Sequence, residues 1–297
     1  MNVYVGLDCG GSNSRVLAVD DGGNVLFQGQ SGAANLTSTP EPRLRRNLER
    51  ATDGCSQANY VCGCFAGLVS DENRSQGEDL LRKLFPGSSI RVEPDYTAAF
   101  YASPSDTDVC VIAGTGSLVC SRHESGMAKS GGRGYILGDE GSGFQYGRDA
   151  VLHFLNHPHL ASPALKQGIL EVFGTDREGK IITAIYSPGT APKALAKMAK
   201  VIGTDAVAGE LYAIESIKRN GGALANVVSG HVQRFLPDSE SLSISLAGSI
   251  WKAAPFYQRF REMLADRLPE RILTVHRITK PPLHGAIELA KELNLVN

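Results

Sequence analysis

The chain has 297 residues, enough for one large domain or two domains of ordinary size. Hydrophobic residues make up 42% of it, so a large core can be buried, and the formal net charge is −1. This charge balance is unlike that of a nucleic-acid-binding protein, and no apolar run is long enough to cross a membrane. The first residues enter a strand pattern at once, which predicts no secretory signal. The densest basic run, Arg43-Leu-Arg-Arg46, lies in a helical pattern and is interpreted as a solvated face.

Cysteine usage favours a reducing compartment. No two cysteines form a C-x-x-C pair, and most lie in apolar strand-like runs, where a thiol behaves as a small hydrophobic group. The pattern predicts free thiols and a cytoplasmic protein rather than a disulfide framework. The six cysteines are Cys9, Cys55, Cys62, Cys64, Cys110 and Cys120.

The chain opens with a strand, a glycine-rich turn and a second strand, from Val3 to Val16 and beyond. Asp8 ends the first strand, and Gly10 and Gly11 allow backbone geometries that other residues resist. A carboxylate beside successive bare N–H groups suits a Mg²⁺–phosphate site, because the amides cradle phosphate oxygens and the acid holds the metal. An ordinary hairpin with an acidic corner is the alternative interpretation.

The pattern that follows predicts an α/β domain. A turn over 21–24 leads into a third strand, so the opening is an antiparallel meander, and a polar loop over 31–39 contains Asn35. The predicted elements are strands over 25–28, 60–65 and 90–92 and helices over 40–55, 72–85 and 96–101.

The opening pattern recurs in the middle of the chain. Asp108 to Cys120 is again a strand, a glycine-rich turn and a strand, with a further turn over 124–126. We interpret this as one structural unit used twice. Two similar domains facing each other would place both turns at the walls of one cleft, with nucleotide phosphates between them.

Glycines then concentrate over 131–143, which marks a loop where the backbone approaches a ligand or another backbone. The stretch 163–235 is almost entirely helical in period, with predicted caps at Asp176, Thr190 and Thr204 and an interruption at Gly221-Gly222. The other predicted elements are helices over 144–155, 255–268 and 284–293 and strands over 242–246 and 272–275.

Two common nucleotide-binding motifs are excluded. No G-x-x-x-x-G-K-[ST] sequence occurs, so the chain has no P-loop. Gly114-Thr-Gly116 lacks the third glycine of a dinucleotide fingerprint, and a strand rather than a helix follows it. A phosphate loop between two strands belongs to a different architecture.

Seven motifs, in order and nearly from end to end, resemble the BadF/BadG/BcrA/BcrD ATPase family and, within it, the N-acetylglucosamine kinases. They are Asp8-Cys-Gly-Gly-Ser12, Asn35, Phe65-Ala-Gly67, Asp95 with Ala98-Ala99, Gly114-Thr-Gly-Ser117, Gly131-Gly-Arg-Gly-Tyr-Ile-Leu-Gly-Asp-Glu-Gly-Ser142 and Leu246-Ala-Gly-Ser-Ile-Trp-Lys252. The resemblance implies an α/β fold of two actin-like (ribonuclease H-like) domains, each with a mixed sheet flanked by helices, around a central cleft. The expected domains span 1–106 and 107–283, with a C-terminal helix over 284–297 that packs back on the first.

The resemblance also implies roles for individual residues. The first phosphate turn would bind ATP through Gly10, Gly11, Ser12 and Asn13, and the second through Thr115, Gly116 and Ser117, with Gly248 near the adenosine. Asp8 would organise Mg²⁺. The sugar would be held by Asn35, Gly67, Gly132, Arg133 and Asp139, and Asp95 would be the catalytic base.

The chemistry supports the role of Asp95 independently. A sugar hydroxyl has a pKa far above 7, so phosphoryl transfer benefits from a carboxylate that accepts its proton. Asp95 follows Pro94 at the end of a strand and opens a helix, so a simple helix cap is the alternative. For Asp139 and Glu140 the alternatives are loop solubility and, for Glu140, a charge at a helix N-terminus.

One residue departs from the family pattern. N-acetylglucosamine kinases of this family usually carry Trp in the Gly-Gly-x-Gly loop, where this chain has Arg133. A cation there favours an anionic or differently substituted amino sugar, such as N-acetylmuramate with its carboxylate. The alternative is that Arg133 faces solvent or an internal acid.

Two other features have weaker functional readings. His153 and His157 are at i, i+4 spacing, with His159 nearby, but no acid or cysteine completes a metal site and Pro158 ends the helix. Trp251, the single tryptophan, is expected in the core.

The sequence therefore predicts an ATP- and Mg²⁺-dependent amino-sugar kinase, acting on N-acetylglucosamine at the 6-hydroxyl by family resemblance, with N-acetylmuramate or glucosamine as other acceptors. The competing hypothesis is an ATPase that activates a 2-hydroxyacyl-CoA dehydratase or benzoyl-CoA reductase by way of an iron–sulfur cluster. A non-catalytic sugar sensor is a third, which intact Asp8 and Asp95 disfavour. The family resemblance also implies a homodimer.

Overall fold

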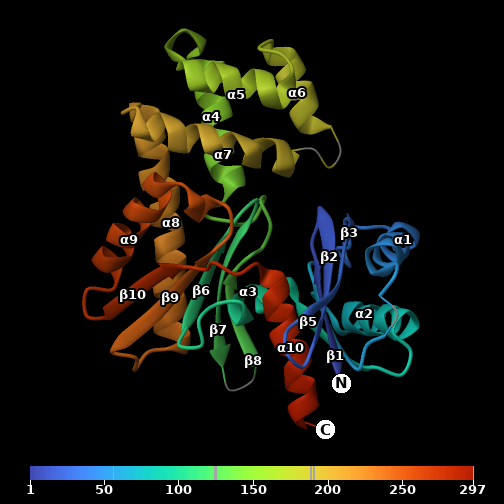
Figure 1. The fold of residues 1–297 in the computed structure, drawn as a ribbon. Helices are drawn as coiled ribbons and strands as arrows, with labels where there is room; N and C mark the ends of the chain where they lie inside the picture. Colours follow the sequence, from blue (N-terminus) through green and yellow to red (C-terminus); the bar gives the residue numbers. More distant parts are fainter. Residues whose placement is uncertain (56, 124–125, 188, 190, 297) are drawn as a thin grey trace. The chain divides into compact units, whose positions relative to one another are not determined.

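The computed structural model describes residues 1–55, 57–123, 126–187, 189 and 191–296 (Figure 1). It divides the chain into two compact units. Unit 1 contains residues 1–107 and the C-terminal segment from Ile278, and unit 2 contains Asp108–Arg277.

Unit 1 is built on one five-stranded mixed sheet with the order β3-β2-β1-β4-β5. The antiparallel meander predicted at the start of the chain forms its first three strands, and β4 and β5 run parallel to β1. The strands are β1 (Val3–Cys9), β2 (Asn13–Asp20), β3 (Val25–Gly32), β4 (Tyr60–Phe65) and β5 (Ser89–Pro94). The helices are α1 (Glu41–Thr52), α2 (Asp71–Leu84), α3 (Asp95–Tyr101) and α10 (Pro282–Val296).

The alternation of side chains along β1 divides the core of unit 1 into two layers. Val5 and Leu7 point to the face covered by α1 and α2, where they join Leu44 and Leu81. Tyr4 points to the opposite face, covered by α3 and α10. A Cβ on Gly6 would lie 2.8 Å from the backbone N of Ile287, so the missing side chain lets α10 pack directly on the central strand.

Unit 2 repeats this architecture. Its sheet has the order β10-β9-β6-β7-β8. Taken from the other end this is β8-β7-β6-β9-β10, the order of unit 1 with β1 to β5 replaced by β6 to β10 in turn. The strands are β6 (Val109–Ala113), β7 (Ser117–His123), β8 (Gly126–Gly131), β9 (Ser241–Ala247) and β10 (Ile272–Arg277). The predicted fold class of two α/β units with mixed sheets and flanking helices is confirmed.

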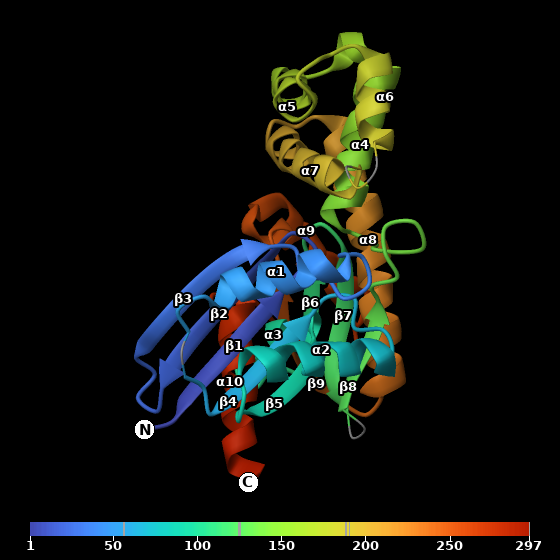
Figure 2. The ribbon, with the colours of Figure 1, turned by 90° about the vertical axis from the view of Figure 1, so that its right-hand side faces the viewer.

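Helices account for the larger size of unit 2. The long helix α8 packs on β7 and β8 of the sheet and α9 packs beside it, while α4 to α7 gather at one end of the unit (Figures 1 and 2). A Cβ on Gly147 would lie 1.7 Å from the carbonyl oxygen of Leu195, so α4 and α7 cross at a glycine. The helices are α4 (Gly143–Asn156), α5 (Pro163–Phe173), α6 (Glu178–Tyr186), α7 (Ala191–Val207), α8 (Leu211–Phe235) and α9 (Ala254–Arg267), with 3₁₀ turns at Pro158–Leu160 and Ile250–Lys252.

Several predicted boundaries in the helical region are wrong. Thr204 lies inside α7, where its hydroxyl bonds the carbonyl of Lys200, and Arg177 rather than Asp176 precedes α6. Helix α8 runs without interruption through Gly221-Gly222. A Cβ on Gly221 would lie 3.4 Å from Met263 Sδ, an ordinary van der Waals distance, so close packing does not require glycine at this position. The predicted cap Thr190 and turn residues 124–125 lie outside the described residues.

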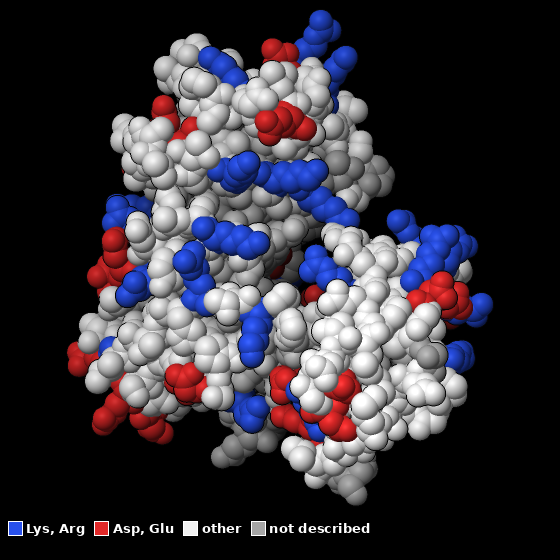
Figure 3. All heavy atoms as spheres, in the orientation of Figure 1, with Lys and Arg blue, Asp and Glu red and all other residues white. Residues whose placement is uncertain are grey.

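The surface agrees with the expected solvated faces. On α1 three arginines are exposed, at Arg43, Arg45 and Arg46, whereas Leu44 is buried. Arg45 forms an ion pair with Glu49. Figure 3 also shows basic side chains in the region of α7, whose exposed positions include three lysines at Lys193, Lys197 and Lys200. Among the described residues, no helix combines the length and the apolar character that a bilayer crossing requires.

The predicted core residues are buried as expected. Trp251 is 2% exposed, and its Nε1–H donates to the carbonyl of Val111. Five of the six free cysteines are fully buried among the strands, and Cys55 is half-buried. Burial raises the pKa of the Cys9 thiol, which makes it a poor nucleophile.

Candidate functional site

In unit 1 predicted site residues lie at the carboxyl ends of neighbouring strands, which form one edge of the sheet. β1, β4 and β5 are parallel, so their carboxyl ends lie side by side, with Asp8 in register with Cys64. Asp8 stands near the end of β1, Gly67 follows β4, and Asp95 follows β5 directly. Residues far apart in the sequence are thus brought to one edge, as the strand order of an open α/β sheet requires.

The turn between β1 and β2 is open toward solvent. The Gly10 N–H donates to the Asn13 carbonyl at 2.9 Å, and the Gly10 carbonyl accepts the Ala34 N–H at 3.0 Å. Gly11, Ser12 and Asn13 are exposed, and an added Cβ on Gly11 would have no described atom within 4 Å. The turn therefore leaves room for a group that contacts its backbone, as phosphate oxygens would.

Asp8 is a partly exposed carboxylate beside this turn. Burial raises the pKa of Asp8, and the Arg15 guanidinium from the paired strand opposes the rise. Because burial disfavours the negative charge, a cation at the carboxylate would stabilise its ionised form. An oxygen donor of this kind, near the end of a strand, fits a Mg²⁺ ion that keeps several of its waters.

Asp95 is the first residue of α3, and Pro94 occupies the capping position before it. The interpretation of Asp95 as the helix N-cap is therefore wrong. Its carboxylate and that of Asp8 both raise the pKa of the buried Cys9 thiol, after the larger effect of burial itself. Both carboxylates thus lie close enough to the buried Cys9 sulfur to disfavour its negative charge. Asp95 itself is half-buried at the sheet edge.

Asn35 and Gly67 form a second contact at this edge. The Asn35 side-chain oxygen accepts the backbone N–H groups of Thr37 and Ser38 at 2.9 and 2.8 Å. A Cβ on Gly67, which has φ +77°, would lie 2.4 Å from that oxygen. With the oxygen occupied, the Asn35 amide nitrogen has no hydrogen-bond partner in the described part of the chain. It is available to donate to a ligand.

In unit 2 the second glycine turn is held by the start of α4. The Gly114 N–H donates to the Gly116 carbonyl at 2.9 Å. The first two N–H groups of α4, at Gly143 and Phe144, donate to the carbonyls of Gly114 and Thr115 at 2.7 and 3.2 Å. These helix N–H groups, which have no partner within a helix, therefore fix the shape of the turn.

Asp139 links this turn to the glycine-rich loop. It is buried and, among the described residues other than glycine, it alone has a positive φ, of 61°. Its carboxylate accepts the backbone N–H groups of Ser117 and Gly134; burial raises its pKa, and the bond from Ser117 opposes that rise. A residue held in such a conformation needs its surroundings to maintain it. The alternative of a solubilising loop residue is wrong for Asp139.

Gly248 lies next to the same turn. It follows β9 with φ +107°, and a Cβ there would lie 2.2 Å from the carbonyl oxygen of Ala113, just before Gly114. Only glycine fits this position. The residue predicted near the adenosine and the predicted second phosphate turn are therefore neighbours.

Arg133 stands on the loop between Gly131 and Asp139. It is exposed, and none of the described residues forms a hydrogen bond or ion pair with it. Gly132 before it has φ +63° and lies against Leu118. The proposed internal acid for Arg133 is therefore not found among the described residues.

Two residues that hold the site were missed by sequence reasoning. Gln145 Nε2 donates to the Gly138 carbonyl at 3.2 Å, and Thr37 Oγ1 donates to the Gly67 carbonyl at 2.7 Å. Both bonds end on glycine-flanked loops. No specific signal in the sequence points to these bonds, because isolated Gln and Thr side chains near loops are common.

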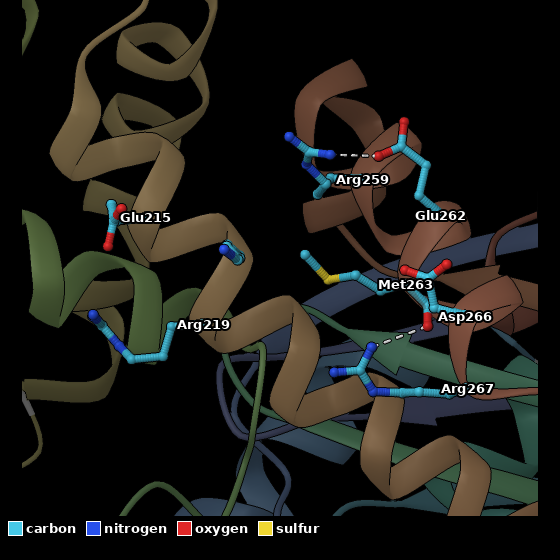
Figure 4. Close-up of a pocket in the computed structure, with 8 residues that line it drawn as sticks. Glu215, Arg219, Arg259, Glu262, Met263, Asp266 and Arg267 are labelled. Atoms are coloured by element: carbon cyan, nitrogen blue, oxygen red, sulfur yellow. Dashed lines mark hydrogen bonds and ion pairs between the residues drawn. The ribbon is translucent and has the colours of Figure 1, made fainter.

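A separate hollow of about 600 Å³ lies between α8 and α9 (Figure 4). Its charges are mixed in sign, and some are paired, with Arg259 bonded to Glu262 and Arg219 to Asp149. Arg267 bonds the Met263 carbonyl. None of the predicted site residues lines it, so it is interpreted as a solvated groove between two helices.

His153 is engaged in packing. Its ring stacks on that of Tyr212 with a centroid separation of 3.9 Å and an interplanar angle of 1°. Burial lowers the pKa of His153, and neighbouring His157 lowers it further. The described residues contain no group of three or more His, Cys, Asp or Glu arranged to hold a metal ion.

Known proteins resemble the chain over most of its length. An N-acetylmuramic acid/N-acetylglucosamine kinase of Clostridium acetobutylicum is 25% identical over 304 residues, covering 98% of this chain and 99% of that protein. A glucosamine kinase of Vibrio cholerae is 25% identical over 231 residues, 74% of this chain and 76% of that protein.

Solved structures share the fold. A ROK family glucokinase of Streptomyces griseus, in complex with glucose and AMPPNP, superposes with a TM-score of 0.61 and 17% identity over 98% of this chain and 100% of that one. A provisionally named N-acetylglucosamine kinase of Chromobacterium violaceum gives a TM-score of 0.71 and 21% identity, over 98% and 99%. The model of one family matches residues 5–290. The chain belongs to the BadF/BadG/BcrA/BcrD ATPase family.

Proposed function

We propose that the protein transfers the γ-phosphoryl group of ATP to an amino sugar, N-acetylglucosamine foremost, at its 6-hydroxyl. The observation that carries this proposal is the meeting of Asp8, Asp95 and the Asn35–Gly67 pair at one sheet edge. The curated relatives that act on N-acetylglucosamine, N-acetylmuramic acid and glucosamine support the class of acceptor.

The two glycine turns would bind the phosphates of ATP. The first offers its exposed backbone at Gly11, Ser12 and Asn13, and the second offers Thr115, Gly116 and Ser117, with Gly248 toward the adenosine. Asp8 would hold Mg²⁺ directly or through water. The ion would supply positive charge that offsets the negative charge of the phosphate groups.

Asp95 would act as the general base. Its carboxylate accepts the proton of the attacking hydroxyl while the sugar oxygen forms a bond to the γ-phosphorus. The bond from that phosphorus to the bridging oxygen breaks, and ADP leaves with the electron pair. Exclusion of water from the bound sugar would matter, because water otherwise competes as phosphoryl acceptor.

Five further residues are proposed to hold the sugar hydroxyls and the acetamido group. Asn35 donates from its unpartnered amide nitrogen, and Gly67 allows the loop to approach it. In unit 2, Gly132, Arg133 and Asp139 belong to one loop and its end. The exposed guanidinium of Arg133 favours an acceptor with a carboxylate, such as N-acetylmuramate, as a second good substrate.

The alternative ATPase activator is less well supported. It would require accessible thiolates for an iron–sulfur cluster, whereas five of the six thiols are buried within the units. The predicted domains, the homodimer and the cytoplasmic location are also parts of the proposal.

A coupled assay for ADP tests the proposal. Purified protein is given ATP and Mg²⁺ with N-acetylglucosamine, N-acetylmuramate, glucosamine or glucose, and the position of the phosphate is read from the ³¹P–¹H coupling of the product. We expect the highest kcat/KM for an N-acetylated amino sugar. A brown protein with iron–sulfur absorbance after anaerobic purification, together with no sugar-dependent ADP release, would favour the activator instead.

A further inference from the structure

Unit 2 contains an apolar groove that the proposed function does not use. It has a volume of about 740 Å³ and lies between α4 and α6, with α7 beneath them. On α4 its wall is formed by Phe144, Arg148, Val151, Leu152 and Leu155, which follow the helical period and so share one face. Ile182, Ile185 and Tyr186 form the facing wall on α6, and Figure 2 shows these helices together at one end of the unit.

The walls present large hydrophobic side chains to solvent. Leu152 is 42% exposed and Ile182 is 40% exposed. A contiguous hollow lined by such residues is typical of a ligand or partner site. Its volume falls in the range of pockets that enclose a small organic molecule.

The charge of the groove is one-sided. Arg148 is exposed and is the single charged side chain among the described lining residues, which include no carboxylate. Within the described part of the chain, its guanidinium forms no hydrogen bond or ion pair. It stands one helical turn from Phe144 and one from Leu152. The groove therefore combines an apolar body with a single unpaired cation, which complements a molecule that is apolar along its length and anionic at one end.

The groove also borders residues that connect to the predicted site. Tyr135, from the loop that carries Arg133, lines the groove. The centroid of its ring lies 4.9 Å from the centroid of the Phe144 ring. The backbone N–H of Phe144 in turn holds the Thr115 carbonyl of the second glycine turn. A molecule in the groove would contact Tyr135 of the loop and Phe144, whose backbone bonds the turn.

We propose that this groove binds a small amphipathic carboxylic acid, with its aliphatic or aromatic body between α4 and α6 and its carboxylate on Arg148. The site is distinct from the residues predicted to hold the sugar and ATP, and the proposal holds whether or not the chain is a sugar kinase. Burial of an alkyl chain against Leu152 and Ile182 supplies the affinity, and the charge-assisted bond to Arg148 sets the polarity of the end group.

Binding is measured with 8-anilino-1-naphthalenesulfonate, a fluorescent amphipathic anion, on the full chain. We expect a saturable increase in fluorescence with one site per chain, reversed by decanoate and not by decyltrimethylammonium. Leu152→Glu, Ile182→Glu and Arg148→Gln should each weaken binding of the dye and of decanoate at least about tenfold. All three positions are exposed, so circular dichroism should show an unchanged fold.

Matched variants outside the groove serve as controls. Leu170 on α5 is 47% exposed and Lys166 is exposed on the same helix, and neither lines the groove. Leu170→Glu and Lys166→Gln should leave binding unchanged. Equal displacement by the cationic and anionic detergents, or equal loss of binding in the control variants, would overturn the proposal. So would a concentration-dependent dimer that Leu152→Glu dissociates, because a second copy of the chain would then occupy the groove.

Discussion

The carboxylate of Asp139 accepts the backbone N–H of Ser117, while the Ser117 hydroxyl donates to the carbonyl of Glu140 at 2.6 Å. Two adjacent residues of the loop end are thus tied to one residue of the second glycine turn. The turn proposed to hold phosphate and the loop proposed to hold sugar therefore cannot shift independently without breaking these bonds. Asp139 has a structural task beside any contact with a ligand.

This relationship predicts different outcomes for two substitutions. Asp139→Asn keeps an acceptor oxygen and a residue type that tolerates positive φ, so the free energy of unfolding should fall by less than about 1 kcal/mol. Asp139→Ala loses the acceptor and strains the backbone, and should cost about 2–4 kcal/mol. Denaturant unfolding measures both. Equal stability of the two variants would show that the bonds to Ser117 and Gly134 do not brace the loop.

A glycine substitution separates a ligand cradle from a structural turn. Gly11→Ala adds a methyl group where the described residues leave open space, so the fold should be unaffected. If phosphate oxygens approach this backbone, KM for ATP should rise at least about tenfold, because the methyl group blocks the contact.

Gly29→Ala provides the contrasting case. There an added Cβ would lie 1.9 Å from the carbonyl oxygen of Ala51, so α1 must move away from β3 and the melting temperature should drop. An unchanged KM for ATP in a well-folded Gly11→Ala variant would remove this turn from the phosphate site.

The base assignment predicts a loss of turnover without loss of ATP binding. Asp95→Asn preserves the size of the side chain at the start of α3 but cannot accept a proton from the sugar. We expect kcat to fall by at least about 10²-fold, the usual contribution of a general base, while the Kd for ATP measured by calorimetry changes little. Substantial residual kcat would exclude Asp95 as the base. Asp106→Asn, an acid in the loop before β6, is the control.

Much of the fold could be predicted because its signals are local. The strand over 60–65 was predicted from a short apolar run and is observed as Tyr60–Phe65. The repeated strand–turn–strand pattern predicted two similar units, and the strand orders match. Helix boundaries were less predictable, since α8 continues through Gly221-Gly222, where the two glycines predicted an interruption.

The site was predictable in its residue types but not in its connections. Asp8, Gly67 and Asp95 could be singled out because each is a glycine or an acid at or just after the end of a predicted strand. The parallel order of these strands then brings the three residues together. Asp139 has a left-handed conformation, and its carboxylate bonds the backbone of Ser117 at the start of β7, far from Asp139 in the sequence. No local pattern encodes such a bond.

Arg133 provides a test of acceptor choice. Replacing it with Trp removes an exposed cation and adds an apolar wall, so kcat/KM for N-acetylmuramate should fall relative to that for N-acetylglucosamine by about tenfold. The ratio of the two values, measured side by side for wild type and Arg133→Trp, reports the change independently of protein stability. An unchanged ratio would mean that Arg133 does not face the lactyl carboxylate. Arg122→Trp, at another exposed arginine of the same unit, controls for the added aromatic side chain.

His231 predicts a specific acid sensitivity of unit 2. Its ring is buried on α8, with Nδ1 2.8 Å from Ser130 Oγ and Nε2 2.9 Å from Ser121 Oγ. Burial lowers its pKa from 6.5 to about 4, and Arg234 adds to the shift. The unfolded chain therefore binds a proton at His231 that the folded chain does not, so stability falls as the pH drops from about 6.5 toward about 4.

The variant His231→Gln removes this titration while keeping a side chain that can reach a serine hydroxyl. Its free energy of unfolding should be lower than that of wild type at neutral pH, but it should decline less steeply between about pH 6.5 and about 4. His159→Gln, at an exposed histidine outside this buried cluster, is the control variant. Urea unfolding at half-unit pH intervals gives the three slopes. A slope in His231→Gln equal to that of wild type would show that the ring is not kept neutral by its burial between β7, β8 and α8.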